Sequence, residues 1–200
     1  RDEDPLHSQD HAEPESEEEL LALADVEGLE HLRGALARGV GVVSPLAHLG
    51  NWEFQGVTTA PLIGPSAVVA RPLDNPALDR RLVAFRASTG NIVIYKQKAL
   101  PEVLKSLREG RVVGIVVDQN VQAKDGIFVQ FFGRPACTTT VAAALALKTG
   151  CPIVPARCVL RADGRYRMVY GPPVQWSSSG RRAEDLARLT QDIASIIEAW

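Results

Sequence analysis

The residues from Val112 to Val117 form an unbroken apolar run in which every residue but one glycine is β-branched. Such a run is typical of a strand that is buried on both faces, and strands of this kind occur in parallel sheets covered by helices. A second apolar run, from Gly39 to Leu46, also predicts a buried strand. The sequence therefore predicts an α/β fold with a layered, mixed but largely parallel sheet flanked by helices.

The other segments follow the alternation of strands and helices that such a fold requires. Short apolar runs predict strands, leucines three or four residues apart predict helices, and glycine or proline separates the segments. We expect an extended excursion at 126–132 and a hairpin that turns at 162–165. The remaining expected strands are 67–70, 92–95, 152–160 and 166–170, and the expected helices are 26–38, 53–62, 77–88, 100–109, 138–148 and 184–200.

Acidic residues are concentrated at the start of the chain. Residues 1–20 hold nine of the 24 acidic residues and one of the 22 basic ones, so the rest of the chain carries a net charge of +6. A mildly basic body suits anionic partners such as phospholipid, a phosphorylated acceptor or an acidic carrier protein, although such a charge is also ordinary for a soluble domain. We expect an acidic arm over 1–25, disordered or divergent, and one domain over 26–200, with no nucleic-acid partner.

Three further properties limit the function classes. The cysteines Cys137, Cys151 and Cys158 lack the spacing of a metal site and are typical of reduced thiols, so we expect no metal centre. No apolar run approaches the roughly 18 residues that a membrane-spanning helix needs. Neither a P-loop nor a dinucleotide-binding glycine fingerprint is present, and we expect no cofactor.

The strongest functional signal is the segment His48-Leu49-Gly50-Asn51-Trp52-Glu53. It follows the apolar run 39–46, so His48 is predicted on a turn at the carboxyl end of a strand, where ligands bind in open α/β sheets. A straight helix would point His48 and Glu53 about 140° apart, but a turn that leads into a helix can bring them together. Imidazole accepts a proton near neutral pH, and a carboxylate on its other nitrogen fixes the tautomer. We therefore predict His48 as a catalytic base and Glu53 as the residue that orients it.

The residues between His48 and Glu53 support a site. Gly50 leaves room for a close approach and Asn51 is a residue type that caps helices, so we place both beside the substrate. On spacing alone, however, a histidine after a strand is more often a capping or packing residue than a functional one.

Two more polar clusters follow predicted strands. Arg71, with Asp74 and Asn75, follows 67–70, and Asp118-Gln119-Asn120 follows 112–117. Because the carboxyl ends of parallel neighbours share one edge of a sheet, all three clusters are expected to face one crevice. Taken alone, Arg71 is equally well a solvated charge, and Asp-Asn-Pro is a common turn.

The segment AHLGNWE resembles the His-x-x-x-x-Asp/Glu signature of glycerolipid-type acyltransferases. Its glutamate form is similar to that of the bacterial lipid A biosynthesis lauroyl/myristoyl acyltransferase family, in the lysophospholipid acyltransferase-like superfamily. RPLDNP at 71–76, the Asp-Gln-Asn segment at 118–120 and FFGRPACTTT at 131–140 resemble further segments of that family. The likeness covers roughly residues 26 to 200 and implies a fold like that of glycerol-3-phosphate acyltransferase.

The resemblance also implies roles for individual residues. Arg71 is the expected contact for an acceptor phosphate or for the phosphopantetheine of a carrier protein. Thr138 and Thr139 are expected to cap a helix whose start favours an anion. Phe131 and Phe132 are expected to wall an acyl channel, although core packing explains two aromatic residues as well. The expected substrate contacts are completed by Asp118, Gln119, Asn120, Gly133 and Arg134.

An acyltransferase at the cytoplasmic face of the bacterial inner membrane is the function that the resemblance implies. It would move a fatty acyl chain from acyl carrier protein or acyl-CoA to a hydroxyl of a membrane glycolipid, with a lipid A precursor as first choice. His48 would take the proton of the attacking hydroxyl, without a covalent acyl-enzyme. The resembled family has a membrane-anchoring helix before this motif and this chain shows none, and the predicted helix 184–200 stops without a cap. We therefore expect a sequence truncated at both ends.

Other acceptors and other function classes stay open at this stage. Phosphatidylinositol mannosides and lysophospholipids are acceptors of related enzymes. A non-catalytic module that binds lipid or carrier protein is a second class, and a hydrolase in which His48 activates water is a third. A single-turnover assay separates an enzyme from a binding module, and thioesterase activity that exceeds transfer would indicate the hydrolase.

Overall fold

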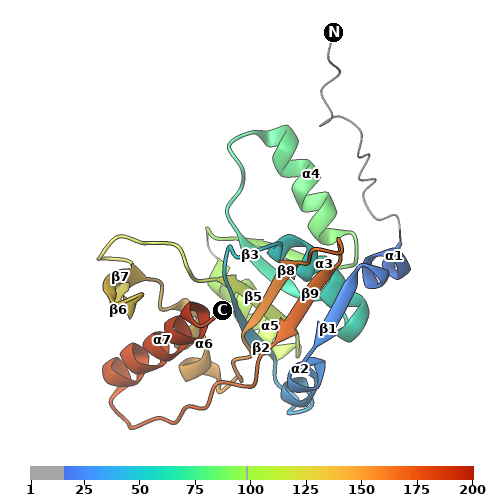
Figure 1. Cartoon of the computed structure of the whole chain (residues 1–200). Helices are drawn as coiled ribbons and strands as arrows, with labels where there is room; N and C mark the ends of the chain where they lie inside the picture. The colour runs from blue at the N-terminus through green and yellow to red at the C-terminus, as the bar shows by residue number, and fades with distance from the viewer. Residues whose placement is uncertain (1–15, 98) are drawn as a thin grey trace.

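A four-stranded parallel sheet forms the centre of the protein (Figure 1). The computed structural model describes residues 16–97 and 99–200. The order of the strands in space is β2-β5-β3-β4, and every pairing is parallel, as the apolar runs predict. The run with the strongest β-branched character thus lies inside the sheet. The four strands are β2 (Val42–Leu46), β3 (Ala67–Ala70), β4 (Ile92–Tyr95) and β5 (Val112–Val116).

A smaller sheet of three strands has the order β1-β9-β8. β8 and β9 form the predicted antiparallel hairpin, whereas β1 pairs with β9 in parallel. The predicted helix 26–38 is wrong at its start, because β1 comes first and Gly28, with φ of 70°, turns the chain into α2 (Leu29–Leu36). The strands are β1 (Ala24–Glu27), β8 (Ala156–Leu160) and β9 (Tyr166–Tyr170).

Helices cover both faces of the central sheet, because alternate residues of a strand point to opposite sides. Val42 and Val112 pack with α2 and α3 (Trp52–Ile63) in one apolar cluster. Val43 and Val113 pack on the other face, with helices that come later in the chain. The mixed α/β architecture with a parallel sheet is therefore confirmed. The helices of that second face are α5 (Ala99–Arg108), α6 (Val141–Thr149) and α7 (Arg182–Glu198), and α4 (Pro76–Ala87) projects from the sheet beside α3 (Figure 1).

The segment after β5 leaves the central sheet and forms a hairpin of its own. Its strands, β6 (Ile127–Phe131) and β7 (Arg134–Thr138), pair antiparallel and lie against α7 (Figure 1). The predicted extended excursion is therefore the first half of a two-stranded hairpin. The helix predicted from residue 138 begins at Val141, since Thr138 is still part of β7.

Part of the predicted acidic arm is folded. Its residues 1–15 lie outside the described residues, so the arm stays a prediction there. Glu17–Ala22 is a helix, α1, and the side chain of Ser16 caps it by accepting a hydrogen bond from the N–H of Glu19 at 3.2 Å. Leu20 is 4% exposed and packs into the cluster with α2 and α3. One buried leucine thus anchors a segment whose composition predicts solvent exposure.

The turn after β2 depends on Gly50. Its φ is 69°, and a Cβ atom at this position would lie 2.0 Å from the carbonyl oxygen of Cys158 in β8. The two backbones are joined there, since the N–H of Asn51 donates to the same oxygen at 2.9 Å. Gly56 in α3 is the contrast, because nothing lies within 4 Å of the position that its Cβ would take.

We predict that Gly50→Ala lowers the free energy of unfolding by roughly 2–4 kcal/mol, because the added methyl group forces the turn away from β8. Gly56→Ala should raise it by roughly 0.5–1 kcal/mol, because alanine is the better helix former. Urea unfolding followed by circular dichroism measures both values. Equal effects of the two substitutions would show that the contact with β8 does not fix this turn.

Candidate active site

His48 and Asp118 meet because their strands pair in register. Leu46 of β2 lies opposite Val116 of β5, and each polar residue follows two positions later. The Nδ1 atom of His48 lies 2.8 Å from Oδ1 of Asp118, and the backbone N–H of His48 donates to Oδ2 at 2.8 Å. One carboxylate thus holds both the ring and the backbone of the histidine.

This contact sets the chemistry of the imidazole. An ionised carboxylate only accepts hydrogen bonds, so in the neutral imidazole Nδ1 carries the proton and Nε2 keeps its lone pair. No residue of the described part of the chain forms a hydrogen bond with Nε2. The side chain of His48 is 41% exposed and that of Asp118 is 22% exposed, so a ligand can reach the ring while the carboxylate is mostly covered. Such a pair can remove a proton from a hydroxyl group and stabilise the resulting imidazolium.

Glu53 does not have the partner that the sequence predicts. Its carboxylate receives two hydrogen bonds from the guanidinium of Arg86, at 2.8 Å from Nε and 2.5 Å from Nη2. Glu53 lies in the first turn of α3 and Arg86 near the end of α4, so the pair joins two helices. The expected contact between Glu53 and His48 is corrected accordingly, because the carboxylate that holds the imidazole comes from Asp118.

Arg86 is a candidate site residue that no sequence motif indicates. Its side chain is 7% exposed, and its guanidinium carbon lies 5.2 Å from the centre of the Trp52 ring. That ring in turn meets His48 edge-on, with 5.8 Å between the ring centres. Arg86 therefore contacts both Glu53 and Trp52, and Trp52 forms a wall beside the imidazole. One feature of the sequence could have indicated it. Arg86 follows Leu82 by one helical turn on the apolar side of α4, and a charged residue there needs a buried partner.

Gly50 and Asn51 serve the turn that carries His48. The close approach at Gly50 is made by the backbone of β8. Asn51 caps α3, as its residue type predicts, because its side chain accepts a hydrogen bond from the N–H of Phe54 at 2.9 Å. Its amide group also donates to the hydroxyl of Tyr166 at 3.1 Å. Substrate contact by Gly50 and Asn51 stays a prediction.

Arg71 lies at the same edge of the sheet as His48 and Asp118, since it follows β3 and β3 pairs in parallel with β5. Its side chain is 76% exposed and forms an ion pair with Asp74 at 3.2 Å. Exposed ion pairs contribute at most ~1 kcal/mol, so an anionic ligand can replace Asp74 at little cost. The structure thus brings His48 and Asp118 into contact and leaves Arg71 exposed along the same edge.

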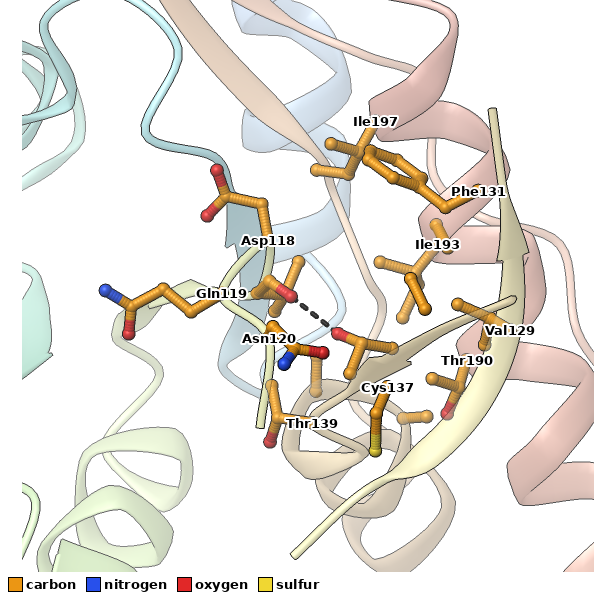
Figure 2. A pocket seen from close by; sticks show the side chains of 16 residues that line it. Asp118, Gln119, Asn120, Val129, Phe131, Cys137, Thr139, Thr190, Ile193 and Ile197 are labelled. Atoms are coloured by element: carbon orange, nitrogen blue, oxygen red, sulfur yellow. Dashed lines mark hydrogen bonds between the residues drawn. The ribbon is translucent and has the colours of Figure 1, made fainter. Parts of the chain in front are cut away.

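A cavity of about 80 Å³ begins beside Asp118 (Figure 2). Its polar side is formed by Asp118, Gln119 and Asn120, three of the residues that the sequence places at the site. The other walls are apolar and come from the β6–β7 hairpin, α6 and α7. They include Val129, Phe131, Ala142, Ala143, Ile193 and Ile197.

The residues of the predicted FFGRPACTTT segment divide between two places. Phe131, Thr138 and Thr139 line the cavity beside Asp118, whereas Phe132 lies at the tip of the hairpin and is 68% exposed. The hydroxyl of Thr138 donates to the carbonyl of Val117 at 2.6 Å, so it joins the hairpin to the end of β5 (Figure 2). Of the two expected caps of α6, Thr139 alone contacts the start of the helix, because its hydroxyl accepts a hydrogen bond from the N–H of Val141 at 3.3 Å. Gly133 and Arg134 are exposed beside Phe132.

A second cavity, of about 50 Å³, lies on the opposite face of the central sheet. Trp52, Glu53 and Arg86 bound it, and Leu46 and Val112 belong to its apolar lining. The His48–Asp118 pair therefore lies between two cavities. One contains Asp118 in its wall, and the other contains Trp52, which touches the imidazole ring.

Residues 11–200 match the family described as bacterial lipid A biosynthesis acyltransferase. The chain belongs to this family. The resemblance predicted from the histidine motif is therefore confirmed, and the match begins inside the segment that we expected to be an arm. None of the helices that the structure describes has the length and apolar character to cross a bilayer.

Three relatives of this acyltransferase-family chain show how much of a related protein it covers. It is 34% identical over 171 residues to a phosphatidylinositol mannoside acyltransferase of Mycobacterium tuberculosis H37Rv, covering 84% of this chain and 52% of the relative. The protein of the same description from Mycolicibacterium smegmatis is 32% identical over 174 residues, covering 85% and 55%. A lipid A biosynthesis acyltransferase of Haemophilus influenzae is 23% identical over 184 residues, covering 91% and 57%. The chain spans about half the length of the curated relatives it matches.

The three cysteines of this acyltransferase-family chain are buried and free. Burial raises the pKa of the Cys158 thiol to about 12. The thiolate is the nucleophilic form, so this cysteine stays unreactive across the pH range in which an enzyme works. The burial agrees with a mechanism that does not use a cysteine nucleophile.

We predict that Cys158 reacts slowly with a thiol reagent in the folded protein and rapidly in urea. Because the pKa is raised, the thiolate fraction is small at neutral pH and keeps rising, without a plateau, from about pH 7 to about pH 10. Labelling followed by mass spectrometry of peptides measures the rate at this residue. A plateau near the ordinary thiol pKa of about 8.5 would contradict the burial of Cys158.

Proposed function

We propose that this protein transfers a fatty acyl chain from a thioester donor to a hydroxyl group of a membrane glycolipid. The observation that carries the proposal is the double contact of His48 with Asp118, at 2.8 Å from each carboxylate oxygen. It provides an oriented base with an accessible nitrogen next to an apolar cavity. Attack of a hydroxyl on an acyl thioester needs such a base and room for the acyl chain.

His48 is proposed to act as the general base. Its Nε2 takes the proton of the acceptor hydroxyl while the hydroxyl oxygen attacks the thioester carbonyl. Asp118 stabilises the imidazolium through Nδ1–H and keeps its own charge. When the tetrahedral adduct collapses, the thiolate leaves with the proton from Nε2, and the histidine returns to its neutral form. No covalent acyl-enzyme is formed.

Glu53 and Arg86 are proposed as positioning residues. Arg86 is buried, and loss of either partner of a buried ion pair leaves an uncompensated charge, at a cost of roughly 3–5 kcal/mol. The pair holds α3 against α4 and keeps the Trp52 ring under the guanidinium, where it borders His48. In this proposal Glu53 affects the position of the imidazole indirectly, through Arg86 and Trp52.

The cavity beside Asp118 is the proposed site of the part of the acyl chain that lies next to the reacting carbonyl group. Its apolar walls from the β6–β7 hairpin, α6 and α7 suit a hydrocarbon chain, while its polar side suits the reacting carbonyl group. Phe131 is its aromatic wall, as the resemblance implies. Phe132 does not belong to the lining, so the channel role expected for it is not part of this proposal.

The donor is proposed to be acyl carrier protein or acyl-CoA. Arg71 is proposed to bind a phosphate of the donor or the acceptor, because guanidinium matches phosphate geometry.

A phosphatidylinositol mannoside-type acceptor is favoured over a lipid A precursor. The relatives named for the former are 32% to 34% identical to this chain, and the relative named for the latter is 23% identical. We place the reaction at the cytoplasmic face of the membrane, where both donors are available.

A non-catalytic binding module and a hydrolase are the rival functions. A module has no need of a base with an accessible nitrogen, so the His48–Asp118 pair favours an enzyme. A hydrolase would release free fatty acid in the presence of the acceptor. Product analysis by mass spectrometry, with and without acceptor lipid, distinguishes all three.

We predict that His48→Ala lowers the rate of acyl transfer by ~10²–10⁴ with little change in folding, because the base is lost. His31→Ala is the matched control, since Nδ1 of His31 also has a single partner, the carbonyl oxygen of Tyr170 at 3.0 Å. The control should keep most of the activity. The assay uses a radiolabelled acyl thioester and phosphatidylinositol mannoside, and circular dichroism checks the fold.

A His48→Ala variant that keeps more than half of the transfer rate would overturn the role of this histidine. Equal losses in the His48 and His31 variants would mean that the effect is structural. Transfer to lipid A precursor but not to phosphatidylinositol mannoside would keep the mechanism and reverse the choice of acceptor.

A further inference from the structure

Phe132 occupies a backbone position that phenylalanine rarely adopts. It is the one non-glycine residue with positive φ in the described chain, with φ of 50°, and Gly133 follows with φ of 69°. Phe131 pairs with Arg134, so Phe132 and Gly133 alone form the turn between β6 and β7. Two-residue turns with positive φ at both positions strongly prefer Asn-Gly, because asparagine tolerates this conformation. A bulky aromatic residue is therefore placed here against its backbone preference.

Burial does not explain this choice. Phe132 is 68% exposed and Phe128 is 66% exposed, which makes them the two most exposed large apolar side chains that the structure describes. Phe128 points outward because side chains alternate along β6, and its neighbour Val129 faces the cavity beside Asp118. Phe132 has one aromatic contact, edge-on to Phe131 with 4.7 Å between ring centres.

The position of the hairpin does not depend on these two side chains either. The N–H of Phe132 donates to Glu198 of α7 at 2.9 Å. The backbone of Gln130 exchanges two hydrogen bonds with the side chain of Gln191, at 2.7 Å and 2.9 Å. The hairpin is thus fixed on α7 through backbone groups, while both phenylalanine side chains stay largely exposed.

We infer that the outer surface of this hairpin, with Phe128 near the start of β6 and Phe132 and Arg134 at the tip, binds the surface of a phospholipid bilayer. Aromatic rings favour the boundary between head groups and acyl chains, and an adjacent guanidinium can reach lipid phosphate. The inner face of the same hairpin carries Val129 and Phe131, which line the cavity beside Asp118. Contact at the tip therefore brings this cavity to the membrane. The inference rests on the proposed function, because the acceptor proposed there is a lipid of the bilayer.

An acidic carrier protein fits this surface less well. Such partners are recognised by clusters of basic residues, whereas the tip has one basic residue, Arg134, and the carboxylate of Glu198 lies against the backbone of Phe132. Two exposed phenylalanines beside one arginine match a bilayer, where the apolar contribution dominates. Binding driven in this way persists when salt screens the charges.

Phe132→Asn in the full 200-residue chain tests the inference. Flotation measures partition into phosphatidylcholine vesicles that contain phosphatidylglycerol, at low and at high salt. We expect partition to fall on the order of tenfold at both salt concentrations, because one aromatic side chain is lost from the interface. The thermal midpoint should stay constant or rise by about 2–4 °C, because asparagine suits the turn. Phe132→Trp should keep the partition, since tryptophan is also favoured at the interface.

Leu160→Asn is the matched control. Leu160 is 61% exposed at the end of another hairpin strand, β8, so its replacement removes a similar apolar area elsewhere. Its partition should equal that of the unchanged protein. His48→Ala should also partition normally, because the vesicles contain no substrate, and this separates failure of the inference from failure of the proposed function.

Three results would overturn the inference. The first is unchanged partition of Phe132→Asn, or no partition of the unchanged protein. The second is a fall in the thermal midpoint of more than about 4 °C, which would mean that Phe132 stabilises the hairpin. The third is a Phe132→Asn variant that binds vesicles normally but transfers acyl chains more slowly only when the donor is acyl carrier protein. That result would assign the tip to binding of the carrier protein.

Discussion

The pairing of β2 with β5 is the interaction on which the site depends. Leu46 lies opposite Val116, so His48 and Asp118 extend side by side from the carboxyl edge of the sheet. A shift of one residue would turn every side chain of the strand to the other face and remove the carboxylate from both groups that it holds. Burial keeps the register in place, because Val42, Val43 and Val113 are fully buried between the two helical layers.

The two layers give the two sides of the histidine different environments. On one side the β6–β7 hairpin, α6 and α7 enclose an apolar cavity that reaches Asp118. On the other side α3 and α4 are joined by the Glu53–Arg86 pair, and Trp52 is held between the guanidinium and the imidazole. The imidazole of His48 is therefore held by a carboxylate from the sheet and bordered by a ring from a helix. In the proposed reaction the first contact orients the base, and the second limits where a substrate can approach.

Local patterns in the sequence determine most of the fold. The strands 67–70 and 92–95 have the predicted bounds because glycine, proline and polar residues flank short apolar runs. The partner of His48 could not be found in this way, since β5 inserts between β2 and β3 and brings Asp118 from 70 residues away. Sequence spacing favoured the nearby Glu53, whose true partner lies 33 residues further on. The acidic composition of the first residues likewise concealed one buried leucine and the strand β1.

The central claim is that Asp118, and not Glu53, orients His48. Nitrogen-15 NMR of the His48 ring tests it directly in Asp118→Asn and Glu53→Gln. In Asp118→Asn an NH₂ group, which only donates, takes the place of one of the two carboxylate oxygens, so one of the two N–H groups of His48 loses its acceptor. We predict that the unchanged protein holds the Nδ1–H tautomer at neutral pH, that Asp118→Asn shifts the ring toward Nε2–H, and that Glu53→Gln leaves the tautomer as it was. A tautomer change in Glu53→Gln with none in Asp118→Asn would contradict the account.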